Sequence, residues 1–289
     1  MTFARGWAQR WKGGNNLEIK AYDIKTGDPS KTIRQKKQDD YRQCGVAGCD
    51  SLGDALTGAN VIFSLVTADQ ALMVAQDAAN HMTKDTLYLD GNSCAPETKR
   101  QAAVIISAVG GHYVDVAVMA PVQMDLIKVP LLLSGHHAKM AQDILQRLTM
   151  STTIIAGDVG TSSTIKMMRS IMIKGMEALT MECILSARKA GVDDRVLSSL
   201  DTSFPEFKWT EKAAYMLERM ATHGQRRAAE MQEVALTVSQ LGLEGKMATA
   251  TAEWQQKIGD LGFKPDPSDK MNYQILADKI LQQLHEEKE

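Results

Sequence analysis

Lys166 lies near the start of the stretch Gly160–Leu179, whose residues have the types and spacing of a long helix. The hydroxyl groups of Gly160–Ser163 can cap the unpaired backbone N–H groups of a first helical turn. One apolar stripe follows at three- and four-residue spacing: Ile165, Met168, Met172, Met176, Leu179 and Cys183. The helix dipole and partial burial would both lower the pKa of a lysine placed there, which suits a general acid/base. A lysine that snorkels from a helix shoulder gives the same pattern.

Asp23 is a second residue whose type and place could do chemistry. It follows the predicted strand Leu17–Tyr22, and an acid there can accept both ribose hydroxyls of an adenosine and repel a 2′-phosphate. Such sites also need a G-x-G-x-x-G turn about 20 residues earlier, and this motif does not occur in the sequence. Judged by chemistry alone, Asp23 is therefore better explained as a turn residue that ends a strand.

The composition narrows the class of protein. The chain has 289 residues, 33 basic and 35 acidic, so its charge gives no reason to expect a nucleic-acid partner. The apolar runs are too short for a membrane span and no signal segment opens the chain, so we expect a cytoplasmic protein. No cysteine lies in a CxxC or at zinc spacing, which predicts reduced thiols and no metal site at the four cysteines Cys44, Cys49, Cys94 and Cys183.

Predicted strands and helices alternate up to about residue 158, and only helices follow. This pattern predicts an α/β Rossmann-like domain at 1–158, with right-handed βαβ units and a mostly parallel sheet, and an all-α domain at 159–289. The predicted strands are 17–22, 60–66, 86–90, 112–118, 129–134 and 152–156. The predicted helices are 2–11, 51–59, 67–82, 96–109, 137–148, 161–190, 193–201, 209–222, 224–241, 246–261 and 270–286, and the lysine-rich stretch 25–42 is predicted to be loop and surface helix.

Several motifs resemble the β-hydroxyacid dehydrogenase superfamily, the relatives of 6-phosphogluconate dehydrogenase. The segment GTSSTIKMMRS is similar to the family's helix start with a catalytic lysine, which corresponds to Lys166. The segment LDGNSCAP resembles the substrate loop, and FSLVTADQA resembles the loop under the nicotinamide. The segments SIMIKGMEALTMECILSARKAGV and ATHGQRRAAEM resemble a poorly characterised phosphogluconate-dehydrogenase-like subgroup.

The resemblance implies hydride transfer between a nicotinamide, NAD or NADP, and a small hydroxy acid or sugar acid. Lys166 would be the general acid/base, and Ser170, where the family usually has asparagine, would orient it. The implied substrate contacts are Asn92, Ser93, His223, Arg226 and Arg227, although the last three also fit a solvated basic helix face with acidic partners such as Glu230. The implied cofactor contacts are Asp23, Leu65, Val66 and Thr67. Asp23 favours NAD, whereas nearby Lys25 could contact the phosphate of NADP.

The chain departs from the family at its front and in one loop. The family's first strand and glycine turn have no counterpart, so we expect that Met1 is an internal methionine or a misassigned start, and that the functional protein is longer. An in-frame glycine turn encoded upstream would support this expectation. The alternative is a short, non-catalytic form that acts through its helical domain. Met119-Ala120-Pro121 replaces the family's Ser-Gly-Gly substrate loop. The resemblance also implies a homodimer.

Overall fold

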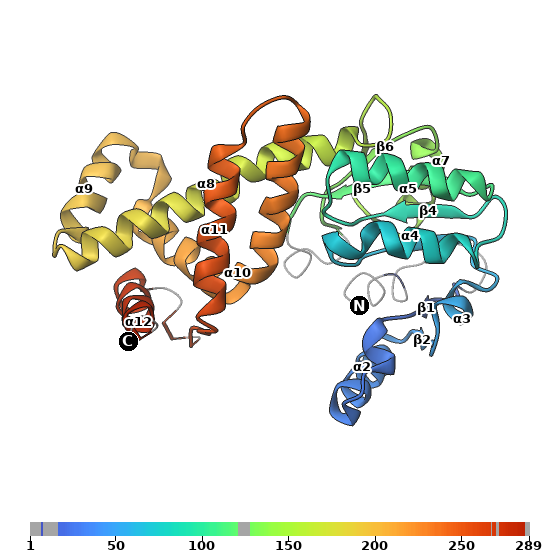
Figure 1. Cartoon of the computed structure of the whole chain (residues 1–289), viewed down its shortest axis with the longest axis horizontal. Coiled ribbons are helices and arrows are strands. Elements are labelled where there is room, and N and C mark those ends of the chain that lie inside the picture. The colour runs from blue at the N-terminus through green and yellow to red at the C-terminus, as the bar shows by residue number, and fades with distance from the viewer. Residues whose placement is uncertain (1–6, 8–16, 121–127, 267, 270–271, 287–289) are drawn as a thin grey trace. The chain divides into compact units, whose positions relative to one another are not determined.

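A computed structural model describes residues 7, 17–120, 128–266, 268–269 and 272–286 (Figure 1). Apart from Trp7, the predicted helix 2–11 lies outside these residues, as does Pro121 of the replaced loop. The chain divides into unit 1, Met1–Lys166, and unit 2, Met167–Glu289, with the division inside helix α8 (Thr161–Lys189). The domain limits 1–158 and 159–289 stay a prediction.

The main sheet of unit 1 confirms the predicted α/β class. Within the described part of the chain it has the order β3-β4-β5-β6-β7, and its neighbours are parallel except for the antiparallel pair β5–β6. Its strands are β3 (Val61–Ser64), β4 (Leu87–Asp90), β5 (His112–Val118), β6 (Leu131–Ser134) and β7 (Thr152–Ile154). The register pairs Asp90 with Asp115, so two carboxylates lie side by side on neighbouring strands.

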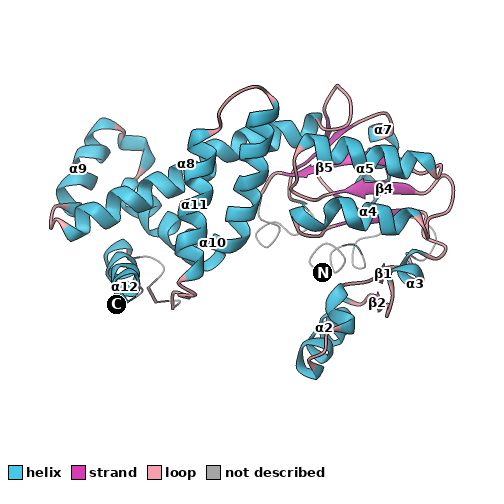
Figure 2. Cartoon of the chain, viewed as in Figure 1, coloured by secondary structure: helices cyan, strands magenta, loops and turns pink. Residues whose placement is uncertain are grey.

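Alternation along the strands assigns side chains to the two faces of the sheet, because successive residues of a strand point in opposite directions. Leu89 and Val114 pack in one cluster with residues of helix α7 (Ala138–Arg147). Tyr88 and Tyr113 pack in another with helices α4 (Ala71–Ala79) and α5 (Pro96–Ala108), which lie side by side (Figure 2). The same alternation turns Asp90 and Asp115 toward the face that α5 covers.

A smaller sheet in unit 1 joins β1 (Lys20–Ala21) and β2 (Ala47–Gly48) in parallel. β1 lies inside a predicted strand, but β2 is only two residues long and was not predicted, because a pair that short shows no alternation. Between and after the strands lie η1 (Ile24–Gly27), α2 (Lys31–Cys44) and α3 (Leu52–Leu56). Helix α4 is preceded by η2 (Ala68–Gln70).

The regular elements in the described residues of unit 2 are all helices, which confirms the predicted all-α class. After α8 come α9 (Asp193–Ser203), η4 (Pro205–Phe207), α10 (Trp209–Gln240), α11 (Lys246–Asp260) and α12 (Tyr273–Glu286). The predicted break between 222 and 224 is wrong, because α10 continues through it. Gly224 serves close packing instead: a Cβ there would lie 2.4 Å from the carbonyl oxygen of Gln255 in α11. None of the described helices is long and apolar enough to cross a bilayer.

Candidate functional site

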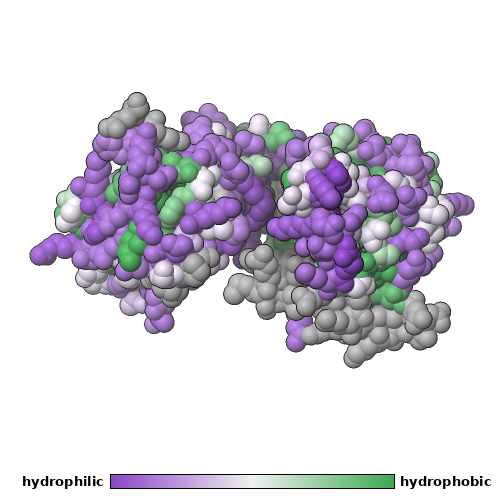
Figure 3. Space-filling view, turned by 90° about the horizontal axis from the view of Figure 1, so that it is seen from below, coloured by the Kyte–Doolittle hydropathy of each residue, from purple (hydrophilic) through white to green (hydrophobic). Residues whose placement is uncertain are grey.

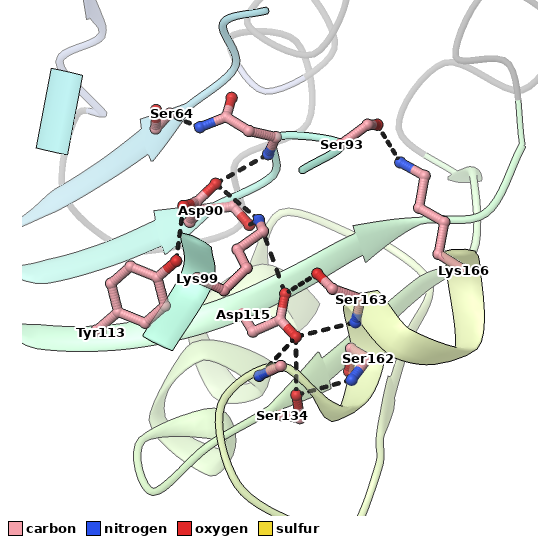
Figure 4. A network of polar contacts seen from close by, with 12 residues as sticks. Ser64, Asp90, Ser93, Lys99, Tyr113, Asp115, Ser134, Ser162, Ser163 and Lys166 are labelled. Atoms are coloured by element: carbon pink, nitrogen blue, oxygen red, sulfur yellow. Dashed lines mark hydrogen bonds and ion pairs between the residues drawn. The ribbon is translucent and has the colours of Figure 1, made fainter. Parts of the chain in front are cut away.

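Two segments of unit 1, far apart in the sequence, bring an amine and a hydroxyl together. Lys166 Nζ donates to Ser93 Oγ at 2.5 Å, across 73 positions of sequence (Figure 4). Ser93 follows strand β4, and Lys166 lies in the second turn of α8, where it is partly buried. Ligands of open α/β sheets bind at the carboxyl ends of strands, so this pair occupies the expected place for a reaction site.

The N-terminus of helix α8 is capped by the carboxylate of Asp115, a residue of strand β5. Asp115 accepts hydrogen bonds from the backbone N–H groups of Gly160 at 3.1 Å and Ser163 at 2.9 Å, and from Ser163 Oγ at 2.6 Å. The prediction that the hydroxyls of Gly160–Ser163 cap the helix is therefore wrong for Ser163, whose hydroxyl donates. A buried negative charge at the positive end of α8 offsets part of the dipole field that Lys166 would otherwise experience.

Lys99 of α5 lies beneath the loop that follows β4. The side chain is fully buried, and Nζ donates to the carbonyl oxygen of Asp90 at 2.7 Å and to Asp90 Oδ1 at 2.7 Å. Asp115 Oδ1 is 3.7 Å from the same nitrogen. Burial alone would lower the pKa of Lys99, but nearby negative charge, above all that of Asp90, outweighs burial and raises this pKa. Lys99 is therefore a cation shared by two carboxylates.

Tyr113 completes the surroundings of Asp90. Its hydroxyl donates to Asp90 Oδ2 at 2.6 Å. Burial, followed by the charge of Asp90, holds the pKa of Tyr113 well above its ordinary value, so the phenol remains a neutral donor.

Asn92 connects the predicted substrate loop to the predicted nicotinamide loop. It is 2% exposed; Oδ1 accepts from the N–H of Val66 at 2.6 Å, and Nδ2 donates to Ser64 Oγ at 3.0 Å. Both ends of its amide are thus used within the protein, and its contact with substrate stays a prediction. Leu65 and Val66 are 47% and 38% exposed, which offers apolar surface beside this loop. Thr67 is exposed.

Asp23 has partners of its own in unit 1. Its carboxylate accepts from the N–H of Lys25 at 3.0 Å, which caps η1, and pairs with Lys37 Nζ at 2.7 Å. Burial would raise the pKa of Asp23, but the bonds from Lys37 and the Lys25 N–H lower it, so the group is a carboxylate at neutral pH. These contacts agree with the turn-residue interpretation, and a ribose contact stays a prediction.

The site residues predicted in unit 2 lie on α8 and α10. Ser170 follows Lys166 by one helical turn on α8. Arg227 is buried and forms an ion pair with Glu177, to whose carboxylate Gln255 also donates at 3.2 Å. Arg227 is thus paired with Glu177 inside the unit, and its contact with substrate stays a prediction.

Arg226 and His223 lie nearer the surface of unit 2. Arg226 is exposed and pairs with Glu230 one turn along α10, the type of partner that a solvated basic face would use. Glu230 also forms an ion pair with Lys174, whose Nζ lies 2.7 Å from Glu230 Oε2. Burial and then neighbouring Arg219 lower the pKa of His223, so this imidazole is neutral at pH 7. Their substrate contacts stay predictions.

Sequence reasoning missed the role of Lys99. Lys99, Ala102 and Ile106 follow one another at spacings of three and four in a predicted helix, and all three are buried. A charged residue on the apolar stripe of a helix was therefore the available signal. The two partners of Lys99, Asp90 and Asp115, could not be predicted from the sequence, because they lie on different strands.

Comparisons with known proteins agree with this architecture. Residues 14–157 match the model of the NAD binding domain of 6-phosphogluconate dehydrogenase, and residues 187–258 match a domain of unknown function, DUF1932. A conserved hypothetical protein from Sinorhizobium meliloti is 33% identical, with 98% of this chain and 92% of that chain covered and a TM-score of 0.73.

Two further solved structures are similar. The conserved protein MTH1747 of unknown function, described as structurally similar to 3-hydroxyacid dehydrogenases, is 27% identical over 90% of this chain and 92% of that one, with a TM-score of 0.67. The 3-hydroxyisobutyrate dehydrogenase of Mycobacterium tuberculosis shares the fold, with 13% identity, 96% of each chain covered and a TM-score of 0.68. The matched NAD-binding domain, the helical unit and these relatives show that the chain belongs to the hydroxyacid dehydrogenase superfamily that includes 6-phosphogluconate dehydrogenase.

Proposed function

We propose that this protein is an NAD(P)-dependent dehydrogenase that transfers a hydride between the nicotinamide and the hydroxyl-bearing carbon of a small hydroxy acid or sugar acid. The family supports an oxidoreductase with a nicotinamide cofactor. The observation that carries the finer proposal is the 2.5 Å contact between Lys166 Nζ and Ser93 Oγ. In this contact the Lys166 amine binds the hydroxyl group of Ser93. A substrate hydroxyl would need the same kind of hydrogen bond to the amine.

In the oxidative direction, neutral Lys166 accepts the proton of the substrate hydroxyl while the adjacent C–H bond breaks. A bound nicotinamide would supply the hydride acceptor, so the substrate would lose one hydride from carbon and one proton from oxygen, in total two electrons and two protons. Ser93 holds the substrate oxygen near the amine, and Ser170 orients the amine from the next helical turn. In the reductive direction, protonated Lys166 returns the proton. The exposed apolar side chains of Leu65 and Val66 suit the face of a nicotinamide ring, and Asp23 suits a ribose.

Cofactor binding is the direct test of this proposal. We expect NADH to quench tryptophan fluorescence saturably when titrated into the 289-residue chain, and to bind more tightly than NADPH because Asp23 would repel a 2′-phosphate. In Asp23→Asn this preference for NADH should weaken, whereas Asp28→Asn, which changes a nearby acid of the same loop, should keep it. If the folded chain binds neither nucleotide, the dehydrogenase proposal fails for this chain. The alternative, a non-catalytic protein that acts through its helical unit, is then favoured.

We also propose that unit 2 forms a homodimer through helix α8. Apolar surface is visible on the unit among hydrophilic residues (Figure 3). Met172 and Leu179, seven positions apart on one face of α8, are each 64% exposed. Exposed apolar side chains that repeat on one face of a helix are typical of an interface between subunits.

Light scattering after gel filtration tests the dimer. We expect twice the monomer mass for the unaltered protein and the monomer mass for the double variant Met172→Glu and Leu179→Glu, because charges are costly at the core of an interface. The matched control is Leu243→Glu with Met247→Glu, two residues that are each 65% exposed near the start of α11. A monomeric unaltered protein, or equal dissociation by both pairs of substitutions, would contradict an interface on α8.

A further inference from the structure

The loop that carries Ser93 and the helix that carries Lys166 are joined through one buried ammonium group (Figure 4). Lys99 contacts Asp90, which directly precedes the loop, and Asp115, which binds the start of the helix. All three side chains are completely buried. We infer that Lys99 is a positioning residue, which sets the geometry of the Ser93–Lys166 pair by tying both segments to one charge. This inference rests on the proposed role of Lys166 and Ser93.

On the loop side, the connection runs through Asp90 to the residues that follow β4. Lys99 Nζ holds both the carbonyl oxygen and the carboxylate of Asp90, each at 2.7 Å. The same carboxylate oxygen accepts from the N–H of Asn92 at 2.9 Å. Ser93 follows directly in the chain, so the position of the Asp90 carboxylate constrains the place where Ser93 Oγ can lie.

On the helix side, the connection runs through Asp115 to the first turn of α8. Asp115 binds the N–H groups of Gly160 and Ser163 and the hydroxyl of Ser163. Lys166 comes three residues after Ser163, on the next turn of the same helix. A shift of the Asp115 carboxylate would therefore move the start of α8, and the base of the Lys166 side chain with it.

Charge explains why the joining residue is a lysine. Asp90 and Asp115 are register partners on neighbouring strands, and like charges directly opposite each other destabilise a sheet. A cation between them turns this repulsion into attraction for both strands. A buried ion pair is often no more stabilising than well-packed apolar residues, so stability alone gives little reason for a lysine at this position. Fixing two segments at a defined separation is a use that an apolar side chain could not supply.

The chemical reactivity of the Lys166 amine tests this inference without cofactor or substrate. Limited acetylation with an activated ester, followed by mass spectrometry of peptides, gives a rate for each lysine. In the unaltered protein, the hydrogen bond to Ser93 should slow acetylation of Lys166 relative to exposed Lys189. In Lys99→Met, release of that bond should raise the relative rate about fivefold, the factor that corresponds to a hydrogen bond worth about 1 kcal/mol.

The matched control is Lys174→Met, because Lys174 is also a buried lysine in an ion pair but belongs to unit 2. It should lower stability and leave the relative rate at Lys166 within about twofold of the unaltered protein, less than one hydrogen bond would change it. A folded Lys99→Met protein with an unchanged rate at Lys166 would overturn the inference, as would an equal rise in Lys174→Met.

Should Lys99→Met not fold, Ser163→Ala is the milder variant, because it removes only the hydroxyl that donates to Asp115 at 2.6 Å. It should raise the relative rate at Lys166 in the same direction, and a wild-type rate in this folded variant would again overturn the inference. Since no turnover is measured, a coupled Lys99 and Lys166 in a protein without dehydrogenase activity would refute the proposed function alone.

Discussion

Turnover falls about 10²- to 10⁴-fold when Lys166 is replaced by methionine, if this residue is the general acid/base, because positioned proton transfer contributes about that factor. Methionine retains the apolar part of the side chain and helical propensity, so α8 should remain intact. The measurement is kcat with NAD⁺ or NADP⁺ for whichever small hydroxy acid the unaltered protein oxidises. Affinity for NADH should stay within about twofold, because Lys166 acts on the substrate proton and not in cofactor binding.

Lys189→Met is the control for this substitution. Lys189 is exposed at the last position of the same helix, so its loss changes the net charge equally and should leave kcat unchanged. If Lys166→Met retained the kcat of the unaltered protein, the amine would have no part in proton transfer and the mechanism would be wrong. A loss of NADH affinity that matched the loss of kcat would instead indicate a role for Lys166 in binding.

The free energy of unfolding should fall by about 3–5 kcal/mol in Asp115→Ala, because removal of one member of a buried, hydrogen-bonded charge network leaves its partners unsatisfied. The substitution removes the acceptor for Gly160 N–H, Ser163 N–H and the Ser163 hydroxyl, and also one carboxylate next to Lys99. Urea denaturation followed by circular dichroism measures the effect as a lower midpoint.

Asp143→Ala provides the comparison for Asp115. Asp143 also pairs with a lysine, Lys139 at 2.7 Å, but its side chain is 52% exposed, and surface pairs contribute about 0–1 kcal/mol. If the two variants unfolded at the same urea concentration, the cap that Asp115 supplies to α8 would contribute no more to the free energy of unfolding than a surface ion pair does. The start of α8 would then depend on local sequence alone.

Local sequence determined most of the helices and strands of this protein, because helix and strand patterns depend on neighbours within a few residues. β5 begins and ends at the predicted residues, and the long helix with Lys166 starts at Thr161, as its glycine and hydroxyl residues indicate. The change from alternating strands and helices to helices alone also predicted the two classes of structure correctly. The motif around Lys166 indicates the family from local sequence alone.

Only the tertiary structure decided which groups meet. The Lys166–Ser93 contact spans 73 positions and the Asp115–Ser163 contact spans 48, and no periodicity encodes contacts of that range. Gly224 illustrates the same limit: a glycine within a helical pattern predicts an end, but here a neighbouring helix occupies the space where a Cβ would lie. Partners such as these depend on packing across the whole unit, so the sequence named the chemical groups and the fold determined their partners.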